Sequence, residues 1–396
     1  MPQSSLGGSL GKRGDDPLPD ISRLSPKSPS KYDSILALAD GTSYMGSHFG
    51  AEKESLGELV FNTSMSGYQE ALTDPSYAGQ ILTFCYPLQG NYGTNKTDFE
   101  SEKVHVRAVV ASEICGDESY SHYSANRSYS QYLKENDVPG IAGVDTRAIV
   151  RKVREHGVMP AAISLLDKGA SEKERADLIL ELQEKLSTYK YGEINFVKEV
   201  STKKIQAFSP PKISKRIALI DCGVKMSIIR EMVGRNVEVV AYPFDVSPQT
   251  LLKEKFDGVL VSNGPGDPAL MKGTISTVKT LIPKLPLFGI CLGHQIISHA
   301  LGGTTYKLKF GHRGSNHAVL NPETGKVYIT TQNHGFAAKE VPSKIADTLF
   351  INCNDGTNEG LRHKDLPVIS AQFHPEGACG PKDANFLFDE FVKMMG

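Results

Sequence analysis

Hydrophobic and polar positions alternate with a short period along residues 33–170, in segments that Gly and Pro interrupt. Residues 34–39 and 43–46 predict two strands joined by the Asp40-Gly41 turn, which is a good hairpin signal. Other apolar or β-branched segments predict strands, and segments with helical periodicity predict helices. The pattern as a whole predicts a mixed β/α domain. Its further strands are residues 59–62, 80–86 and 104–112, and its helices are residues 128–135 and 146–155.

From residue 214 the pattern changes to an alternation of strands and helices. The apolar segments 217–220, 237–240 and 258–261 are separated by segments with helical periodicity. Continuous apolar strands between helices predict a mostly parallel sheet with helices on both faces. Ligands of such sheets bind beyond the carboxyl ends of the strands. Residues 214–396 are therefore expected to form an α/β domain with its chemistry in those loops.

Two segments lie outside these predicted domains. Residues 171–213 begin with a charged helix at 173–186 and continue as a polar stretch to Pro210-Pro211, so we expect them to connect the domains. Residues 1–32 are rich in Ser, Pro and Gly, which predicts a disordered tail. A transit peptide is the alternative, but such peptides avoid acidic residues. The acidic residues of this segment are Asp15, Asp16 and Asp20.

Composition narrows the class of protein further. The 396 residues carry a net charge of −1, which gives no field that would attract nucleic acid or anionic lipid. No apolar run approaches the roughly 18 residues that a membrane-spanning helix needs. The six cysteines form no C-x-x-C pair, which argues against zinc and against a disulfide framework. We therefore expect a cytoplasmic protein that acts on a small neutral substrate.

A cysteine occupies the most informative position in the chain. The apolar strand at residues 287–290 runs into Cys291-Leu292-Gly293, and a helix is expected to begin near His294. Small flanking residues permit a sharp turn there, and the start of a helix favours a thiolate. For this motif alone, a buried structural cysteine is the alternative interpretation.

A histidine and a carboxylate follow a second strand. The strand at residues 367–373 ends in His374-Pro375-Glu376, so His374 and Glu376 lie on the same side of an extended chain. A nucleophilic cysteine needs a base, and the base needs a partner that fixes its tautomer. Cys291, His374 and Glu376 together predict a complete nucleophilic unit.

Several segments resemble known family motifs. Residues 289–295 and 373–376 resemble the two signatures of the class I glutamine amidotransferases. Within that class, the chain resembles the small chain of carbamoyl-phosphate synthetase over about residues 33–396. The segments that carry this second resemblance are residues 262–268, 332–336 and 354–360, and in the first domain residues 61–70, 73–77 and 90–93.

The resemblance implies roles for individual residues. Cys291 would attack the side-chain amide of glutamine to form a thioester, with His374 as the base and Glu376 orienting its ring. The backbone N–H groups of Gly266 and Leu292 would stabilise the oxyanion. Taken alone, residues 333–335 could be an ordinary turn and Ser76 a cap. The implied glutamine-binding positions are Ser76, Gly264, Gly266, Leu292, Gln295, Asn333, Gly335 and Phe336.

The resemblance also implies a partner. Residues 221–225 follow a strand where a phosphate loop could lie, but they lack the nucleotide-binding fingerprints and are expected to serve packing and scaffolding of the site. We therefore expect no cofactor in this chain, with ATP and Mg on a separate large chain. The two would form a heterodimer that makes carbamoyl phosphate for arginine and pyrimidine biosynthesis. A metal site is not expected, because the histidines lack ligand spacing; those considered are His294, His299, His312 and His317.

Other functions remain open at this point. One is an amidotransferase that serves another synthase, and a second is a free γ-glutamyl hydrolase with the same nucleophilic unit. The first domain argues against both. A third is a docking subunit without catalysis, which the presence of Cys291, His374 and Glu376 argues against.

Overall fold

The computed structural model of the chain describes residues 32–167 and 169–396. The predicted tail at residues 1–32 lies outside the described residues, except for Tyr32.

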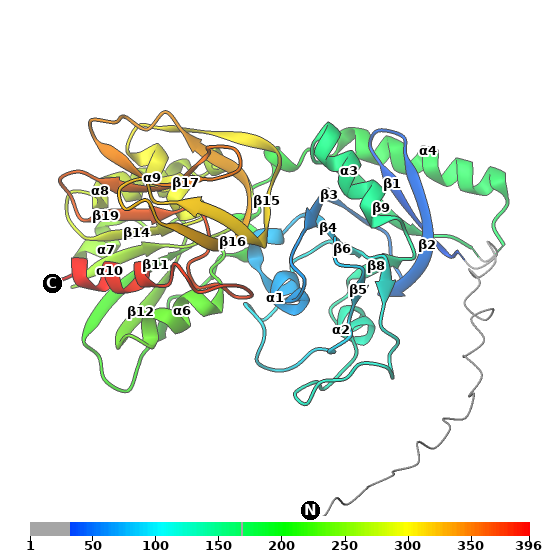
Figure 1. Cartoon of the computed structure of the whole chain (residues 1–396), viewed down its shortest axis with the longest axis horizontal. Coiled ribbons are helices and arrows are strands. Elements are labelled where there is room, and N and C mark those ends of the chain that lie inside the picture. Colours follow the sequence, from blue (N-terminus) through cyan, green and yellow to red (C-terminus); the bar gives the residue numbers. More distant parts are fainter. Residues whose placement is uncertain (1–31, 168) are drawn as a thin grey trace, which may run out of the picture. The chain divides into compact units, whose positions relative to one another are not determined.

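Seven strands in the amino-terminal part of the chain close into a barrel (Figure 1). Their order around the barrel is β1-β2-β8-β6-β4-β3-β9, with both parallel and antiparallel neighbours. Alternate strand residues, among them Leu36, Ile81 and Ile163, form one buried apolar cluster. The strands are β1 (Ser34–Leu38), β2 (Ser43–Gly50), β3 (Ser55–Asn62), β4 (Gln80–Phe84), β6 (Ala108–Val110), β8 (Pro139–Ala142) and β9 (Met159–Leu165); β5 (Leu88–Gln89) and β7 (Glu113–Ile114) pair separately.

Short helices cover the barrel. The helix α3 (Thr146–His156) adds Ile149 and Val153 to the same cluster as the strands. Two others, α1 (Tyr68–Thr73) and α2 (Tyr129–Glu135), pack on the opposite faces of the strands through a second cluster. The prediction of a mixed β/α domain is confirmed.

The predicted strand at residues 104–112 is only partly correct. Just Ala108–Val110 form β6. The His105 N–H donates to the carbonyl oxygen of Leu72, near the end of α1. Residues 104–106 therefore run beside the end of α1, and pairing with β4 begins only at Arg107, whose N–H donates to the carbonyl oxygen of Gln80.

A ten-stranded sheet forms the core of the carboxy-terminal part (Figure 1). Its central strands are parallel, in the order β12-β11-β13-β14-β19, and antiparallel strands extend it on both sides. The predicted parallel sheet is confirmed. The parallel strands are β11 (Lys215–Asp221), β12 (Val237–Pro243), β13 (Gly258–Val261), β14 (Leu287–Ile290) and β19 (Val368–Ala371).

Helices cover both faces of this sheet. On one face, α7 (Pro248–Lys253), α8 (Lys272–Leu281) and α9 (Leu292–Ala300) bury alternate residues of the parallel strands in one cluster. On the other face, α6 (Met226–Val233) and α10 (Phe386–Met394) bury the remaining strand residues in a second cluster. The two helix layers cover the faces of the sheet, so the site forms at the carboxyl ends of the strands.

The sequence analysis did not foresee the long antiparallel strands. The pairing of the first two of these strands, residues 304–320 with residues 327–339, shifts between Lys307 and His312 and again between Gly314 and His317. Such bulges break the alternation of apolar and polar positions from which strands are predicted. The strands are β15 (Thr304–Leu320), β16 (Val327–Lys339), β17 (Ala346–Asn352) and β18 (Asn358–His363).

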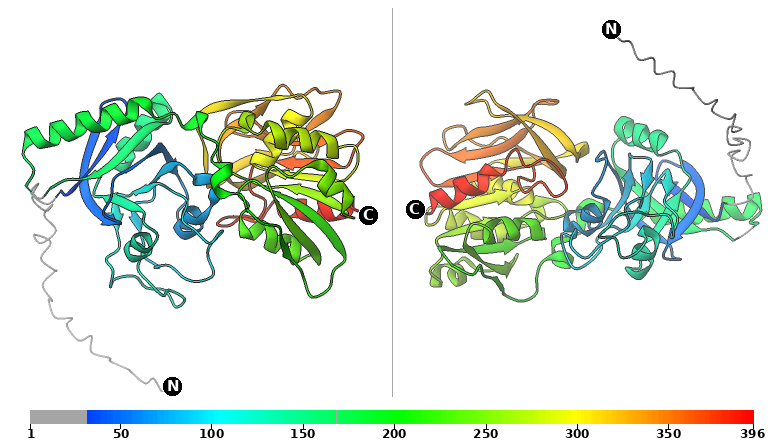
Figure 2. Two further views of the ribbon diagram at one scale, coloured as in Figure 1. Left: turned by 180° about the vertical axis from the view of Figure 1, so that it is seen from behind. Right: turned by 60° about the horizontal axis from the view of Figure 1, so that its bottom comes forward.

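The segment expected to connect the domains contributes elements to both. The helix α4 (Glu172–Thr188) packs Leu182 and Leu186 against β1 and β9, and Figure 2 shows this helix along the outside of the barrel strands. The strand β10 (Gln206–Phe208) pairs with β12 at the edge of the carboxy-terminal sheet. Between them lie η4 (Tyr191–Glu193) and α5 (Val197–Val200).

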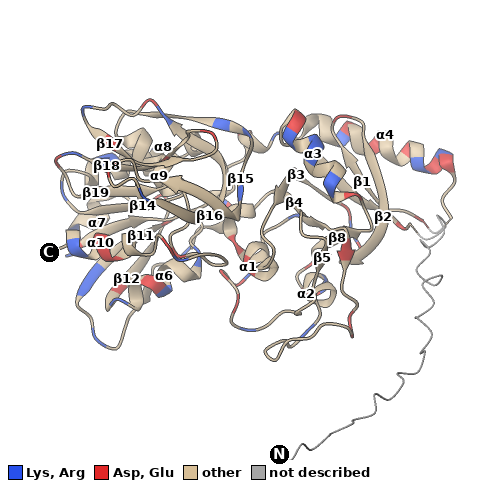
Figure 3. Ribbon diagram, in the orientation of Figure 1, with Lys and Arg blue, Asp and Glu red and all other residues tan. Residues whose placement is uncertain are grey.

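Charged positions of both signs are interspersed over the described ribbon (Figure 3). Among the helices of the described residues, none is long and apolar enough to cross a membrane.

Candidate active site

Cys291 lies at the predicted junction between strand and helix. The strand β14 ends immediately before it, and α9 begins immediately after it. Its φ of 54° is a conformation that residues other than glycine seldom adopt. The side chain is buried, and its Sγ lies 3.6 Å from the carbonyl oxygen of Asn333. The turn holds the thiol at the carboxyl edge of the parallel sheet.

The glycines beside this turn are required by close packing. A Cβ at Gly293 would lie 2.1 Å from the carbonyl oxygen of Val261. A Cβ at Gly289 would lie 2.7 Å from the carbonyl oxygen of Gly293. Neither position has room for a side chain, so only glycine lets α9 approach the sheet this closely.

His374 and Glu376 follow β19, the strand beside β14. The backbone N–H of His374 donates to the carbonyl oxygen of Thr331 at 2.8 Å, which fixes the histidine on β16. Its Nδ1 donates to Glu376 Oε1 at 2.6 Å, because a carboxylate can only accept. Its Nε2 has no hydrogen-bond partner among the described residues, which leaves this nitrogen available to exchange a proton with the thiol or the substrate.

Lys225 completes this arrangement, and the sequence analysis did not assign it a role of its own. Its Nζ donates to Glu376 Oε1 at 3.0 Å and to the carbonyl oxygen of Ala378 at 2.6 Å. The side chain is 2% exposed. Lys225 lies in the loop after β11, at the carboxyl end of a parallel strand. Because sites in such sheets form at these ends, this position could have indicated from the sequence that Lys225 belongs to the site.

The charges in this cluster stabilise one another. Burial raises the pKa of Glu376, but Lys225 and His374 outweigh burial and lower it well below its usual value. Burial lowers the pKa of His374, but the Glu376 carboxylate outweighs burial and raises it. A base of raised pKa beside a fixed carboxylate is suited to shuttle a proton to and from the thiol.

We expect Glu376 to make stability depend on pH. Because its pKa is below the usual 4.5 in the folded chain, its contribution is fully present above pH 4.5 and is lost as the pH falls toward the folded-state pKa. The Glu376→Gln chain lacks this contribution, so its free energy of unfolding should approach that of the parent chain as acid is added. Urea unfolding of both chains from about pH 7 to about pH 3 measures the difference. A difference that stays constant over this range would contradict the expectation.

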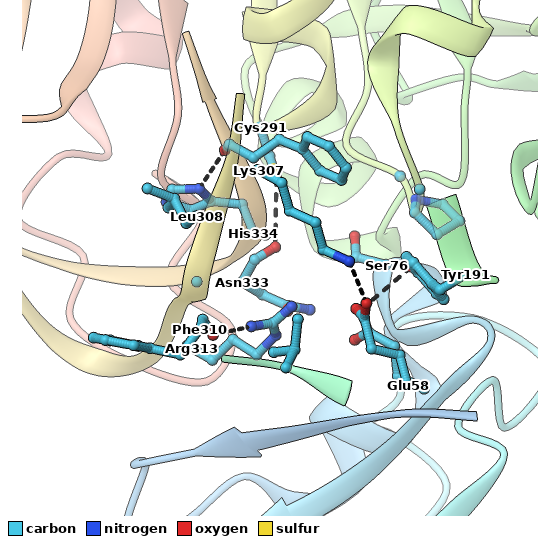
Figure 4. A pocket seen from close by; sticks show the side chains of 18 of the residues that line it. Glu58, Ser76, Tyr191, Cys291, Lys307, Leu308, Phe310, Arg313, Asn333 and His334 are labelled. Atoms are coloured by element: carbon cyan, nitrogen blue, oxygen red, sulfur yellow. Dashed lines mark hydrogen bonds and ion pairs between the residues drawn. The ribbon is translucent and has the colours of Figure 1, made fainter. Parts of the chain in front are cut away.

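The structure brings the predicted glutamine-binding residues together. A pocket lies between the thiol and the barrel, and it includes Cys291 in its wall (Figure 4). Leu292 is not in that wall but is the first residue of α9, next to Cys291. The remaining predicted positions line the pocket: Ser76, Gly264, Gly266, Gln295, Asn333, Gly335 and Phe336.

The structure shows the secondary structure of two segments for which the sequence allowed an ordinary turn or a cap. Residues 333–336 lie in β16 and not in a turn. Ser76 lies in η3 (Pro75–Tyr77), which Asp74 caps by accepting from the Ser76 N–H at 2.9 Å. Both segments therefore present fixed backbone to the pocket.

Asp74 links the barrel to the carboxy-terminal domain at the pocket. Its Oδ2 accepts from Asn333 Nδ2 at 2.8 Å. The neighbouring Ser76 Oγ accepts from Asn263 Nδ2 at 2.9 Å. Asp74 and Asn263 fall within the segments 73–77 and 262–268 that carry the family resemblance, but the sequence analysis gave them no role; the structure shows that they position Ser76 and Asn333.

Buried polar side chains of β15, β16 and the loop at Asp355 form a hydrogen-bonded network. His334 Nδ1 donates to the carbonyl oxygen of Phe336 at 2.7 Å, and its Nε2 lies 3.0 Å from Gln332 Oε1. His312 Nε2 lies 2.9 Å from Asp355 Oδ2. Within the described part of the chain, His312, His334 and Glu359 are close enough to share a cation. The ring nitrogens named here already have hydrogen-bond partners, so the network serves to fix the strand that carries residues 333–336.

Comparisons with known proteins identify the family to which the chain belongs. The family model described as carbamoyl-phosphate synthase small chain, CPSase domain, matches residues 36–163, and that of glutamine amidotransferase class-I matches residues 218–394. A carbamoyl phosphate synthase small chain from Methanocaldococcus jannaschii is 47% identical over 91% of this chain and 99% of its own. One from Fusobacterium nucleatum is 44% identical over 91% of this chain and 98% of its own. A solved glutamine amidotransferase from Thermotoga maritima is 20% identical, with a TM-score of 0.34 over 41% of this chain and 76% of that chain.

The carboxy-terminal part is therefore a class I glutamine amidotransferase domain, preceded by a domain of a second type. The chain as a whole belongs to the family of carbamoyl phosphate synthase small chains.

Proposed function

We propose that this chain hydrolyses glutamine to glutamate and ammonia and delivers the ammonia to a separate large synthetase chain. One observation carries the proposal: Cys291, His374 and Glu376 are buried together at the carboxyl edge of the parallel sheet, beside a pocket built by both domains. Membership of the family supports the same function.

The chemistry begins at the thiol. The Cys291 sulfur bonds to the side-chain amide carbon of glutamine while His374 takes up the thiol proton. His374 then passes this proton to the amide nitrogen, the C–N bond breaks, and ammonia leaves a glutamyl thioester. Water, activated by His374, cleaves the thioester to glutamate and restores the thiol. Glu376 orients the imidazole ring throughout, and Lys225 holds Glu376.

Backbone N–H groups stabilise the oxyanion in this proposal. Leu292 is the first residue of α9, so its N–H is one of the donors that a helix leaves free. Gly266 lines the pocket with a φ of 89°, which glycine adopts without strain. The glutamine itself is bound by Ser76, Gly264, Gly266, Leu292, Gln295, Asn333, Gly335 and Phe336.

The large chain completes the reaction. In this proposal it binds ATP and Mg and combines bicarbonate with the ammonia to form carbamoyl phosphate, and the small chain itself needs no cofactor. The two chains form a heterodimer in the cytoplasm that supplies arginine and pyrimidine biosynthesis.

Amide-labelled glutamine tests the proposal. The complex is purified from its native source and given ATP, bicarbonate, glutamine labelled at the amide nitrogen, and excess unlabelled ammonium. We expect the label in carbamoyl phosphate. A docking subunit without catalysis would leave the product unlabelled, and that outcome would reject the proposal.

Ser76 should contribute to substrate binding across the domain boundary. Its hydroxyl lines the pocket and is held by Asn263, so Ser76→Ala removes one positioned hydrogen bond of about 0.5 to 1.5 kcal/mol. We expect the KM for glutamine to rise several-fold, with a smaller change in kcat. Steady-state hydrolysis measures both, with Ser187→Ala on the exposed face of α4 as the control. An unchanged KM would remove Ser76 from the binding set.

A further inference from the structure

Arg313 is a buried cation in the wall of the pocket. It lies in β15, between the two pairing shifts of that strand with β16. Arg313 is only 3% exposed, and it lines the pocket together with Ser76, Cys291 and Asn333.

The Arg313 guanidinium has little to neutralise its charge. One terminal nitrogen donates to the carbonyl oxygen of Phe310 at 2.8 Å, and Nε has no hydrogen-bond partner among the described residues. No carboxylate of the described residues lies within 4.0 Å of it. Lys307, the other cation in the pocket wall, forms an ion pair with Glu58. A buried charge without a partner is strongly unfavourable, so this arrangement suits an anion supplied by a ligand.

Two glycines make room for the guanidinium. A Cβ at Gly311 would lie 2.4 Å from one terminal nitrogen, and a Cβ at Gly335 would lie 3.3 Å from the other. Gly335 is also one of the proposed glutamine-binding positions. Asn333 lies between Cys291 and Arg313 in the view of Figure 4: its carbonyl oxygen is 3.6 Å from Cys291 Sγ, and it pairs with Arg313 in the sheet.

We propose that Arg313 binds the α-carboxylate of glutamine and thereby selects an amino acid over a simple amide. The proposal rests on the proposed glutaminase function. Glutamine carries a reacting amide at one end and an α-carboxylate at the other, and the wall of this pocket holds both a nucleophile and a cation without a carboxylate partner. A guanidinium presents paired N–H donors to the two oxygens of a carboxylate, a geometry that lysine does not reproduce.

Two substrates separate recognition of the carboxylate from a structural role. One is glutamine, and the other is 4-aminobutanamide, which is glutamine without the α-carboxylate. The variants are Arg313→Met, which replaces the cation with an apolar chain, and Arg313→Lys, which keeps the charge. Arg362→Gln, at a half-exposed position on β18, is the matched control.

We expect Arg313→Met to lower kcat/KM for glutamine roughly tenfold to a hundredfold, mainly through KM, and to change kcat/KM for 4-aminobutanamide less than about threefold. Arg313→Lys should lie between, and Arg362→Gln should match the parent chain. The melting temperature of Arg313→Met should be unchanged or higher, because a buried charge without a partner is removed.

An equal loss for both substrates, or a clear fall in melting temperature, would show that Arg313 is structural and would overturn the inference. Should Arg313→Met fail to fold, the inference is rejected on that ground, and Arg313→Lys then measures how much the guanidinium shape matters. If the parent chain hydrolyses no glutamine in the complex, the proposed function fails instead.

Discussion

The Cys291→Ser chain should fold normally and hydrolyse no measurable glutamine. Serine keeps the shape of the turn at φ 54°, but its hydroxyl is a far weaker nucleophile than a thiol that gives its proton to His374. The variant therefore cannot form the glutamyl thioester through which the reaction proceeds in two steps. Ammonia release is measured in the purified complex, with circular dichroism and the melting temperature as checks on folding.

Ammonia-dependent synthesis provides the internal control for this variant. The Cys291→Ser complex should still make carbamoyl phosphate when free ammonium replaces glutamine, since the chemistry of the large chain is untouched. Cys353→Ser, at an exposed cysteine, should retain both activities. Retention of more than a few per cent of glutamine hydrolysis in Cys291→Ser would reject Cys291 as the nucleophile.

Lys225→Met should damage both activity and stability. The substitution leaves Glu376 buried without its cation, and breaking a buried ion pair costs about 3 to 5 kcal/mol. The pKa of Glu376 then rises, its hydrogen bond to His374 weakens, and the base loses its orientation. We expect kcat to fall roughly 10²-fold. Steady-state hydrolysis and urea unfolding measure the two effects.

A double variant distinguishes the ion pair from simple packing. In Lys225→Met with Glu376→Gln, no buried charge is left without a partner, so much of the lost stability should return while the activity stays low. Stability losses that simply add in the double variant would show that Lys225 and Glu376 do not act as a pair.

The sequence predicted those parts of the structure that depend on residues close together in the chain. The strand at residues 287–290 and the turn at Cys291 have the predicted bounds, because a run of apolar residues followed by small ones is a local signal. The parallel sheet with helices on both faces could be predicted for the same reason. His374 and Glu376 are two residues apart, so their partnership was also visible.

Contacts between distant segments could not be predicted in this way. Lys225 is 151 residues from Glu376, and Asp74 is 259 residues from Asn333. The polar residues of β15 and β16 are buried by hydrogen bonds to one another, as His334 is with Gln332, so they lack the apolar alternation that indicates a strand. Arg313 likewise gains its significance only from the pocket into which the fold buries it.

Trapping of the thioester is the most direct test of glutamine hydrolysis at Cys291. The complex is mixed with carbon-labelled glutamine, quenched in acid during turnover, digested, and analysed by mass spectrometry. We expect a labelled glutamyl group on the peptide that contains Cys291, and no label in the Cys291→Ser complex. Hydrolysis of glutamine with no labelled Cys291, or with the label on another residue, would contradict the proposed mechanism.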